Sequence, residues 1–264
     1  MRLCFGVYFV KFFQCHNEIL SAGENRSGSV YCDSDFGVIF AIVAGRSFKP
    51  LKHSVTKYYL GIIAVCSIII AFSLKTQGGY ESWGGALLDS TFQTVSYLTT
   101  TGFGQADNSG WPLLANTILI VPAIHCGCSG STTGGIKVDR ILISFKAVSN
   151  EIKRRLHPSA VSHIRLSGQH LADDDVNSVL MYIVVYFVVV FISIVGVLLC
   201  GSGVPEAVSG VIASVGSVGP GLADLGCLDN YSAQPAMAKF IYSFDMFLGR
   251  VEIYPVLIAI SLLF

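Results

Sequence analysis

The stretch Thr99-Thr100-Thr101-Gly102-Phe103-Gly104-Gln105-Ala106-Asp107 decides the fold, because a second version of it follows later in the chain. That version is Ser217-Val218-Gly219-Pro220-Gly221-Leu222-Ala223-Asp224, and both contain the pattern G-x-G-x-A-D. Gly102 and Gly219 lie 117 residues apart (219 − 102). Each stretch follows a short apolar segment. The repetition suggests a duplicated pore element with one glycine turn in each copy.

The composition indicates a membrane protein. Of the 264 residues, 52% are hydrophobic and only 13% are charged, and the mean hydropathy is +0.63. Soluble domains carry about 25% charged residues, so a chain this apolar would expose large adhesive patches in water. The net charge is zero, which gives no indication of nucleic-acid binding. The eight cysteines form no C-x-x-C pair, and we interpret them as buried free thiols.

Hydrophobic runs of two lengths alternate along the chain. A helix needs about 20 residues to cross a bilayer, so the longer runs are predicted spans and the shorter ones re-entrant helices. The predicted spans are Tyr58–Leu74, Trp111–Cys126, Val176–Cys200 and Ala233–Phe264, and the short helices are Ala86–Leu98 and Pro205–Gly216. The glycine-rich stretch Gly127–Gly135 interrupts one span, and helicity resumes at Ile136–Val148. The expected fold is an all-α integral membrane protein with tandem membrane helix–pore helix–filter loop–membrane helix repeats, one helix being broken by a Gly-rich intramembrane loop.

Loop charges orient the predicted spans. Lysine and arginine gather at residues 46–57 and 146–165, which places these two connections in the cytoplasm by the positive-inside rule. Both short helices and both glycine turns then enter the membrane from the outer side. Non-helical backbone at membrane depth is tolerated only where it is buried in protein or lines a wet cavity. The repeated turn is therefore a candidate site.

A cation filter replaces the water around an ion with backbone carbonyl oxygens. Several successive carbonyls must point inward, and glycine reaches the necessary backbone angles without a Cβ penalty. Thr100–Gly104 meets this need, and the short helix before it directs its partially negative C-terminus toward the turn. The alternative is a glycine-rich external turn between two helices; its repetition in matching positions favours the pore.

The chain resembles the Trk/Ktr/HKT superfamily of potassium transporters, and most closely the bacterial Trk-type membrane subunit. The resemblance rests on T-T-T-G-F followed by A-D, the stretch Gly127–Lys137, G-P-G-L at Gly219–Leu222, and L-G-R-x-E-I at Leu248–Ile253. It runs collinearly from Asp35 to the C-terminus. Family members have four membrane–pore–membrane units around one pore, and this chain resembles the third and fourth. We therefore expect a fragment. The expected divisions are an unassigned segment at 1–34, the end of a preceding unit at 35–56, the third-type unit at 57–148, a cytoplasmic connection at 149–175 and the fourth-type unit at 176–264.

The resemblance implies two sets of site residues. The potassium filter would comprise Thr100, Thr101, Gly102, Phe103, Ser217, Val218, Gly219 and Pro220. The gate beneath it would comprise Gly127, Ser129, Gly130, Ser131, Thr132, Thr133, Gly134, Gly135, Lys137 and Arg250. Arg250 would face the cavity below the filter, and the alternative for it is an ion pair with Asp245 or Glu252. The Gly127–Gly135 stretch could instead cradle phosphate, but Ile136 and Val138 break the P-loop pattern around Lys137.

The function expected from this resemblance is potassium uptake through a carbonyl-lined filter, without enzymatic activity or a cofactor. The alternatives are a non-conducting membrane piece that needs a partner for the missing filter units, and a phosphate-binding membrane enzyme. The expected partners are potassium ion, membrane lipid, a second copy in a homodimer, and a cytoplasmic nucleotide-binding regulatory subunit that would contact Lys146–Arg165. No nucleic-acid partner is expected. The expected location is the bacterial inner membrane, crossed several times.

Overall fold

The computed structural model describes residues 54–77, 79–127, 133–157, 165–166, 169–222, 225–226, 231–251 and 253–262. The described part is helical apart from a two-residue antiparallel pair, β1 (Arg165–Leu166) with β2 (Gln169–His170). The predicted all-α class is therefore confirmed. The predictions for residues 1–34, for the preceding unit before residue 54 and for Ser129–Thr132 lie outside the described residues. The helices are α3 (Ser54–Gln77), α4 (Trp83–Leu98), α5 (Leu113–His125), α6 (Val138–Leu156), α7 (Asp173–Leu199), α8 (Val204–Val215), the 3₁₀ turn η3 (Tyr231–Ala233), α9 (Ala236–Val251) and α10 (Ile253–Ser261).

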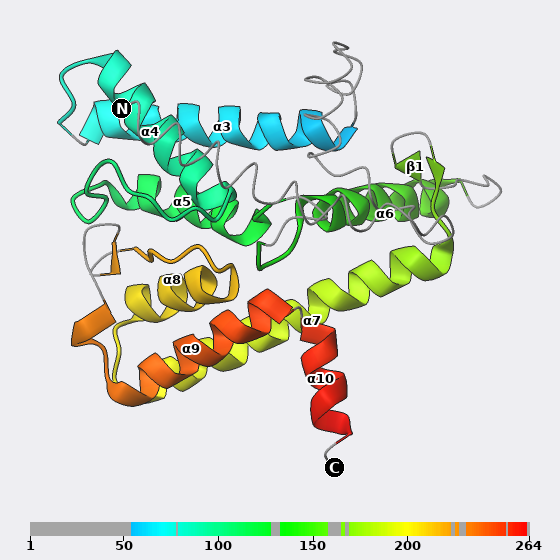
Figure 1. The fold of residues 1–264 in the computed structure, drawn as a ribbon. Helices are drawn as coiled ribbons and strands as arrows, with labels where there is room; N and C mark the ends of the chain where they lie inside the picture. Colours follow the sequence, from blue (N-terminus) through cyan, green and yellow to red (C-terminus); the bar gives the residue numbers. More distant parts are fainter. Residues whose placement is uncertain are drawn as a thin grey trace, which may run out of the picture.

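The same sequence of elements occurs twice. In the first half the long helix α3 is followed by the short helix α4, a turn and helix α5; in the second half α7, α8, a turn and α9 follow in the same order (Figure 1). Helix α4 packs on both α3 and α5, and α8 packs on both α7 and α9. Helix α8 also contacts α5, which joins the two halves. Each short helix is thus held between two neighbours and ends at a glycine turn.

Local sequence explains where the short helices begin. The Ser82 hydroxyl accepts a hydrogen bond from the backbone N–H of Gly85 (3.1 Å), so α4 starts at Trp83, before the predicted Ala86. Pro205 lies in the first turn of α8, where its missing N–H has no helical partner to lose. Three aspartates, Asp173–Asp175, occupy the first turn of α7 and complement the helix dipole.

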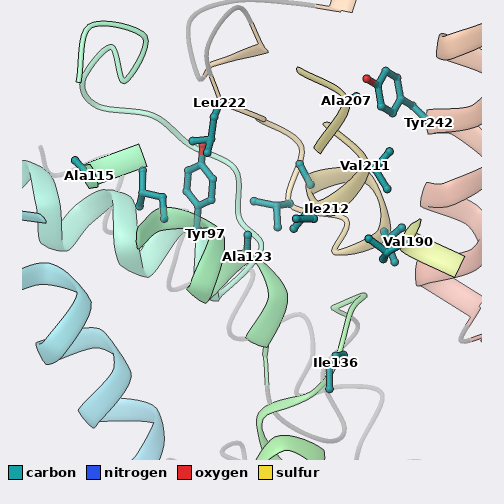
Figure 2. Close-up of a cluster of buried hydrophobic side chains, with 14 of the residues drawn as sticks. Tyr97, Ala115, Ala123, Ile136, Val190, Ala207, Val211, Ile212, Leu222 and Tyr242 are labelled. Atoms are coloured by element: carbon teal, nitrogen blue, oxygen red, sulfur yellow. The ribbon is translucent and has the colours of Figure 1, made fainter. Parts of the chain in front are cut away.

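A buried apolar cluster lies between α5, α7 and α8 and includes the turns. Figure 2 shows Tyr97 of α4 with its ring beside α5 and its hydroxyl end toward Leu222, and Tyr242 beside Ala207 of α8. Ala115, Leu119, Ala207, Val211 and Val215 are fully buried. Small residues on α5 and α8 let these helices approach each other closely. The core therefore sits directly behind the two turns.

Helices α3 and α7 are long and apolar enough to cross a membrane, whereas α5 and α8 are apolar but shorter. Large aromatic side chains on the outer faces of these helices and of α9 remain exposed. Phe72 on α3 is 59% exposed, Phe191 on α7 is 67% exposed and Phe240 on α9 is 71% exposed. Apolar surface of this extent requires an apolar environment or further protein to cover it.

The end of the chain differs from the single predicted span Ala233–Phe264. The structure divides it into α9, which ends at Val251, and α10, which starts at Ile253 and turns away from α9 (Figure 1). Pro255 explains the break, because it has no N–H to donate to the carbonyl of Val251 and its ring crowds that carbonyl. Helix α6, in turn, runs on past the predicted Val148 to Leu156.

Candidate ion filter

The two glycine turns have the same backbone conformation. In the first turn Thr100 (φ 52°) and Gly102 (φ 74°) are left-handed; in the second, Ser217 (φ 54°) and Gly219 (φ 104°) are. The pairs occupy matching positions, 117 residues apart. Left-handed backbone is unfavourable for threonine and serine, and such strain persists only where the surrounding structure enforces it. An alternating backbone of this kind changes the direction of successive carbonyl groups.

The hydrogen bonds that close the two turns also match. Thr100 N–H donates to Tyr97 O (3.2 Å) and Thr101 N–H to Ser96 O (3.0 Å). At the matching positions of the second turn, Ser217 N–H donates to Ser214 O (3.0 Å) and Val218 N–H donates to Ala213 O (2.9 Å). Helices α4 and α8 end in register, at Leu98 and Val215. The repeated motif thus corresponds to a repeated backbone structure.

The turns meet at their glycines. A Cβ atom on Gly102 would overlap the carbonyl oxygen of Val218 and would lie 3.2 Å from Cδ of Pro220. Gly102 therefore has two reasons to be glycine, its positive φ and this close approach. Gly219 has only the first, because a Cβ atom there would meet nothing within 4 Å.

Several carbonyl oxygens of the turns have no donor. Within the described residues, Thr100, Thr101 and Gly102 in the first turn, and Ser217 and Val218 in the second, accept no hydrogen bond at their carbonyls. Val218 is buried and the other four residues are half-buried, so their carbonyls need a partner such as water, and in a filter a cation takes the place of that water. These five oxygens follow directly after the C-termini of α4 and α8, whose dipoles favour a positive charge there.

The first turn is held by its own unit. The Ser96 hydroxyl donates to Phe103 O (2.7 Å), and Gln93 Nε2 donates to Ala106 O (2.9 Å). The hydroxyls of Thr99 and Thr101 are 2.7 Å apart. Ser96 and Gln93 of α4 are fully buried where they make these bonds.

The second turn is held by two tyrosines. Tyr97 of α4 donates its hydroxyl to Gly221 O (2.8 Å) and accepts a bond from Asn108 Nδ2 (3.1 Å). Tyr231 donates its hydroxyl to Gly219 O (3.0 Å). Sequence reasoning missed all three residues. The tyrosines are apolar enough to pass as core, and only their position beside the repeated motif could have singled them out.

The described part of the Gly-rich stretch lies against the end of α8. The left-handed backbone of Cys126 (φ 50°) ends α5, and Ile136 N–H donates back to Ile124 O (3.3 Å). A Cβ atom on Gly134 would press on the carbonyl of Val215 and on Gly216. The stretch thus reaches the last turn of α8, immediately before the second glycine turn. Ser129, Gly130, Ser131 and Thr132 lie outside the described residues.

The end of α9 meets the same point. Gly249 packs on Val215 so closely that a Cβ atom would overlap its carbonyl oxygen. Its neighbour Arg250 is exposed, and within the described residues it forms no ion pair, including with Asp245. The buried Asp245 instead accepts the Ser193 hydroxyl at Oδ1 (2.7 Å). Lys137 lies at the N-terminus of α6 and is half-buried.

The structure brings the two predicted filter stretches together and places one described residue of the predicted gate, Gly134, behind the second of them. Thr100–Phe103 and Ser217–Pro220 meet as two turns, and Gly134, Val215 and Gly249 meet behind the second. Among the described residues, no three or more His, Cys, Asp or Glu side chains form a group that could hold a metal ion. The ligands available at the site are backbone carbonyl and hydroxyl oxygens, and backbone carbonyls are the groups that replace the water around a cation in channel filters.

Proteins named as potassium uptake proteins are similar in sequence to this chain. The chain is 31% identical to the Trk system potassium uptake protein TrkH of Salmonella typhimurium over 85% of its own length and 46% of the relative. It is 35% identical to the TrkH of the same name from Halomonas elongata, over 93% of the chain and 52% of the relative. The chain spans about half the length of these relatives.

The fold comparison agrees. The crystal structure of the potassium transporter TrkH from Vibrio parahaemolyticus superimposes with a TM-score of 0.75 at 31% identity, and it covers 85% of this chain and 48% of that one. The sequence profile of the TrkH family, described as a cation transport protein, matches residues 53–264. The chain belongs to the TrkH family of cation transport proteins.

Proposed function

We propose that this chain supplies two strands of a potassium-selective filter to a membrane transporter. The observation that carries the proposal is the repeated turn: two pore helices end in register, and each leads into the same left-handed alternation closed by the same two hydrogen bonds. The unpartnered carbonyls of Thr100–Gly102, Ser217 and Val218 would replace water around the ion. The relatives' names, which describe potassium uptake, favour K⁺ as that ion.

In this proposal both halves are membrane–pore–membrane units, of the third type at 57–148 and of the fourth type at 176–264. Helices α3 and α7 would cross the bilayer, as their length and hydropathy allow, and α5 and α9 would complete the units. The positive-inside rule would place residues 146–165 in the cytoplasm, in an inner membrane of multi-pass topology. The exposed aromatic rings of Phe72, Phe191 and Phe240 would then face lipid or the units not present in this chain.

The Gly-rich stretch would act as the gate. Gly127, Gly134 and Gly135 keep a straight helix from continuing α5, and Gly134 rests on the end of α8 immediately before the second turn. The hydroxyls of Ser129, Ser131, Thr132 and Thr133 would satisfy exposed backbone groups or contact ions, and Gly130 belongs to the same proposed gate. Arg250, exposed and one residue from the Gly249 contact, would add a positive charge to the cavity below the filter. Lys137 would mark the cytoplasmic end of this gate.

Two strands do not close a filter, so partners follow from the proposal. Two further units must complete the pore. A homodimer and a cytoplasmic nucleotide-binding subunit are the assemblies that we propose around it, with the basic end of α6 at Lys153–Arg155 as the contact for the latter. The second candidate function is a non-conducting membrane piece that assembles with a partner. Membership of a cation-transport family argues against the phosphate-binding enzyme.

Potassium uptake by transport-deficient cells tests the proposal. We would express the chain alone, and also a chimera in which it replaces the matching half of the V. parahaemolyticus TrkH, called the TrkH chimera below. We expect uptake from the TrkH chimera and a clear loss with Gly219→Ser, because serine does not favour the left-handed backbone at that position. A chimera that reaches the membrane without supporting uptake, or one that Gly219→Ser leaves unchanged, would show the proposal to be wrong. Uptake by the chimera but not by the chain alone would show that the missing units are required.

A further inference from the structure

We infer that Tyr97 and Tyr231 are positioning residues that hold the second glycine turn in the shape of a filter strand, and that they thereby set its ion selectivity. The inference rests on the proposed function of the turns, and it assigns a role to side chains outside the filter motif. Each tyrosine donates its hydroxyl to a carbonyl of the second turn, Tyr97 to Gly221 O (2.8 Å) and Tyr231 to Gly219 O (3.0 Å).

The second pore helix braces its turn at Leu222, where the Ser209 hydroxyl accepts a bond from the backbone N–H (3.1 Å) and donates to the carbonyl (3.4 Å). In the first unit Gln93 and Ser96 of α4 hold the carbonyls of Ala106 and Phe103. The positions 117 residues later on α8 are Gly210 and Ala213, which have no side-chain donor. A side chain at Gly210 would also collide with Tyr242 and Leu225. The carbonyls of Gly219 and Gly221, which precede Leu222 in the turn, are the ones that the two tyrosines contact.

Tyr97 acts across the two units. It stands on α4, its hydroxyl end points toward the second turn beside Leu222 (Figure 2), and its side chain is 2% exposed. The amide of Asn108 donates to the same hydroxyl, which orients its proton toward Gly221. The matching position on α8 is Ser214, whose short side chain carries no ring that could extend to the first turn. A side chain of the first unit therefore holds the backbone of the second turn, and the matching position of the second unit cannot do the same for the first.

Tyr231 acts from the outer loop. Its ring packs edge-on against Tyr242 of α9 (centroids 5.3 Å apart), and the nearby Ser202 hydroxyl donates to Gln234 Oε1 (2.8 Å) to fix the loop. Burial raises the pKa of Tyr231, so its hydroxyl stays protonated and remains a donor. Gly219 O accepts this bond, whereas the two preceding carbonyls, of Ser217 and Val218, accept no bond from the described residues.

Selectivity depends on how rigidly such carbonyls are held. Both hydroxyls contact carbonyls at or just beyond the left-handed Gly219, so losing either bond frees the backbone to relax from its alternating conformation. The free oxygens of Ser217 and Val218 would then adapt to a smaller ion at lower cost. Removing one brace should thus lower the preference for K⁺ over Na⁺ without removing a filter oxygen.

The test replaces each tyrosine by phenylalanine in the TrkH chimera and measures ⁸⁶Rb⁺ uptake in the presence of competing Na⁺. We expect Tyr97→Phe and Tyr231→Phe each to lower the Rb⁺-over-Na⁺ ratio by about fivefold, the factor that corresponds to one net hydrogen bond. Tyr242→Phe is the matched control. Its hydroxyl also donates to a backbone carbonyl, that of Glu206 (3.3 Å), but at the far end of α8. We expect it to change the amount of protein and not the ratio.

A structure of the full chain carrying both substitutions separates this inference from the proposed function. We expect Ser217 or Gly219 to lose its positive φ, while Thr100 and Gly102 keep theirs. Unchanged ratios in both single variants, or an unchanged second turn in the double variant, would overturn the inference. If the wild-type TrkH chimera takes up no Rb⁺, the proposed function fails, and the structure of the double variant still decides whether the tyrosines hold the turn. If the double variant does not fold, the single-variant ratios decide.

Discussion

The carbonyl oxygen of Val218 lies in the space that a Cβ atom of Gly102 would occupy, so the two glycine turns touch at a point where no side chain fits. Because of this contact, two glycines at equivalent positions of the repeat differ in how much room they have for a side chain. Gly102 and Gly219 share a motif, a position and a positive φ, but only Gly102 has backbone from the other turn in the space of its missing Cβ.

Substituting each glycine by alanine should reveal that inequality. Both changes force alanine into left-handed backbone, which costs roughly 1–2 kcal/mol. Gly102→Ala must in addition push the two turns apart, so we expect it to abolish potassium uptake by the TrkH chimera, while Gly219→Ala retains a measurable part. Uptake is normalised to the amount of protein in the membrane. Equal losses from the two variants would contradict the contact.

The packing of α9 on the end of α8 predicts opposite effects of alanine at two helical glycines. Gly249→Ala places a methyl group into the Val215 carbonyl, and such overpacking typically costs about 1–3 kcal/mol. Gly61→Ala on α3 meets nothing within 4 Å and should stabilise the helix by about 0.5–1 kcal/mol. Thermal unfolding of the purified protein in detergent measures both. A Gly249→Ala protein as stable as the wild type would show that α9 does not pack on α8 in this way.

The buried carboxylate of Asp245 on α9 predicts different stability effects for two further substitutions. Ser193→Ala removes the hydroxyl that donates to Asp245 Oδ1 and leaves a buried acceptor unsatisfied, at a cost of about 1–3 kcal/mol. Asp245→Asn keeps an oxygen for Ser193 and removes the possibility of a buried charge, so we expect no loss of stability. Thermal unfolding again provides the measurement. A destabilising Asp245→Asn would indicate that the carboxylate itself has a further partner in the assembled transporter.

The contact between Gly134 and the end of α8 predicts a change in flux. Gly134→Ala should displace the Gly-rich stretch from Val215 and Gly216 and alter the rate of potassium uptake by at least about threefold, the effect of less than 1 kcal/mol on a barrier. The Rb⁺-over-Na⁺ ratio should stay constant, because the filter carbonyls are untouched. A changed ratio with a constant rate would place this stretch in the filter instead of the gate.

The hydrogen bonds in the loop after the first turn predict how a substitution at Ser109 changes the pKa of Asp107. The Ser109 hydroxyl (2.7 Å) and amide (2.9 Å) donate to Asp107 Oδ1, and they hold the pKa of this exposed carboxyl below its usual range. These bonds are present at pH above the ordinary pKa of aspartate and are lost as the pH falls through the lowered value. Ser109→Ala should raise the pKa of Asp107, as NMR titration of the carboxyl carbon would show. No change would mean that the backbone amide suffices.

Much of the helical order could be read from the sequence, since long apolar runs, Pro205 and the repeated G-x-G-x-A-D each carry a local signal. Pro255 also indicates the break before α10, but it lies within a continuous apolar run that reads as a single span. Ser82 caps α4, which therefore starts at Trp83 and not at the predicted Ala86. A serine followed by Trp-Gly-Gly does not by itself predict a helix start.

The bracing of the second turn could not be read in the same way. Tyr97 and Gly221 are 124 residues apart, and hydrophobic periodicity says nothing about which distant carbonyl a buried hydroxyl meets. The useful clue lay in a comparison of the two units, where Gln93 and Ser96 are matched by Gly210 and Ala213. At these two positions the second copy has no polar side chain, and the hydroxyls of Tyr97 and Tyr231 hold carbonyls of its turn instead.

The bond between Tyr97 and Gly221 also has a consequence for biogenesis. A ribosome adds residues from the N-terminus, so Tyr97 enters the membrane well before Gly221 has been synthesised. The braces of the first turn, Ser96 and Gln93, lie in the first unit itself, so we expect that turn to form before the second turn is synthesised. If the gene is rearranged so that the second unit is synthesised first, we expect a protein that inserts into the membrane but reaches its final fold slowly.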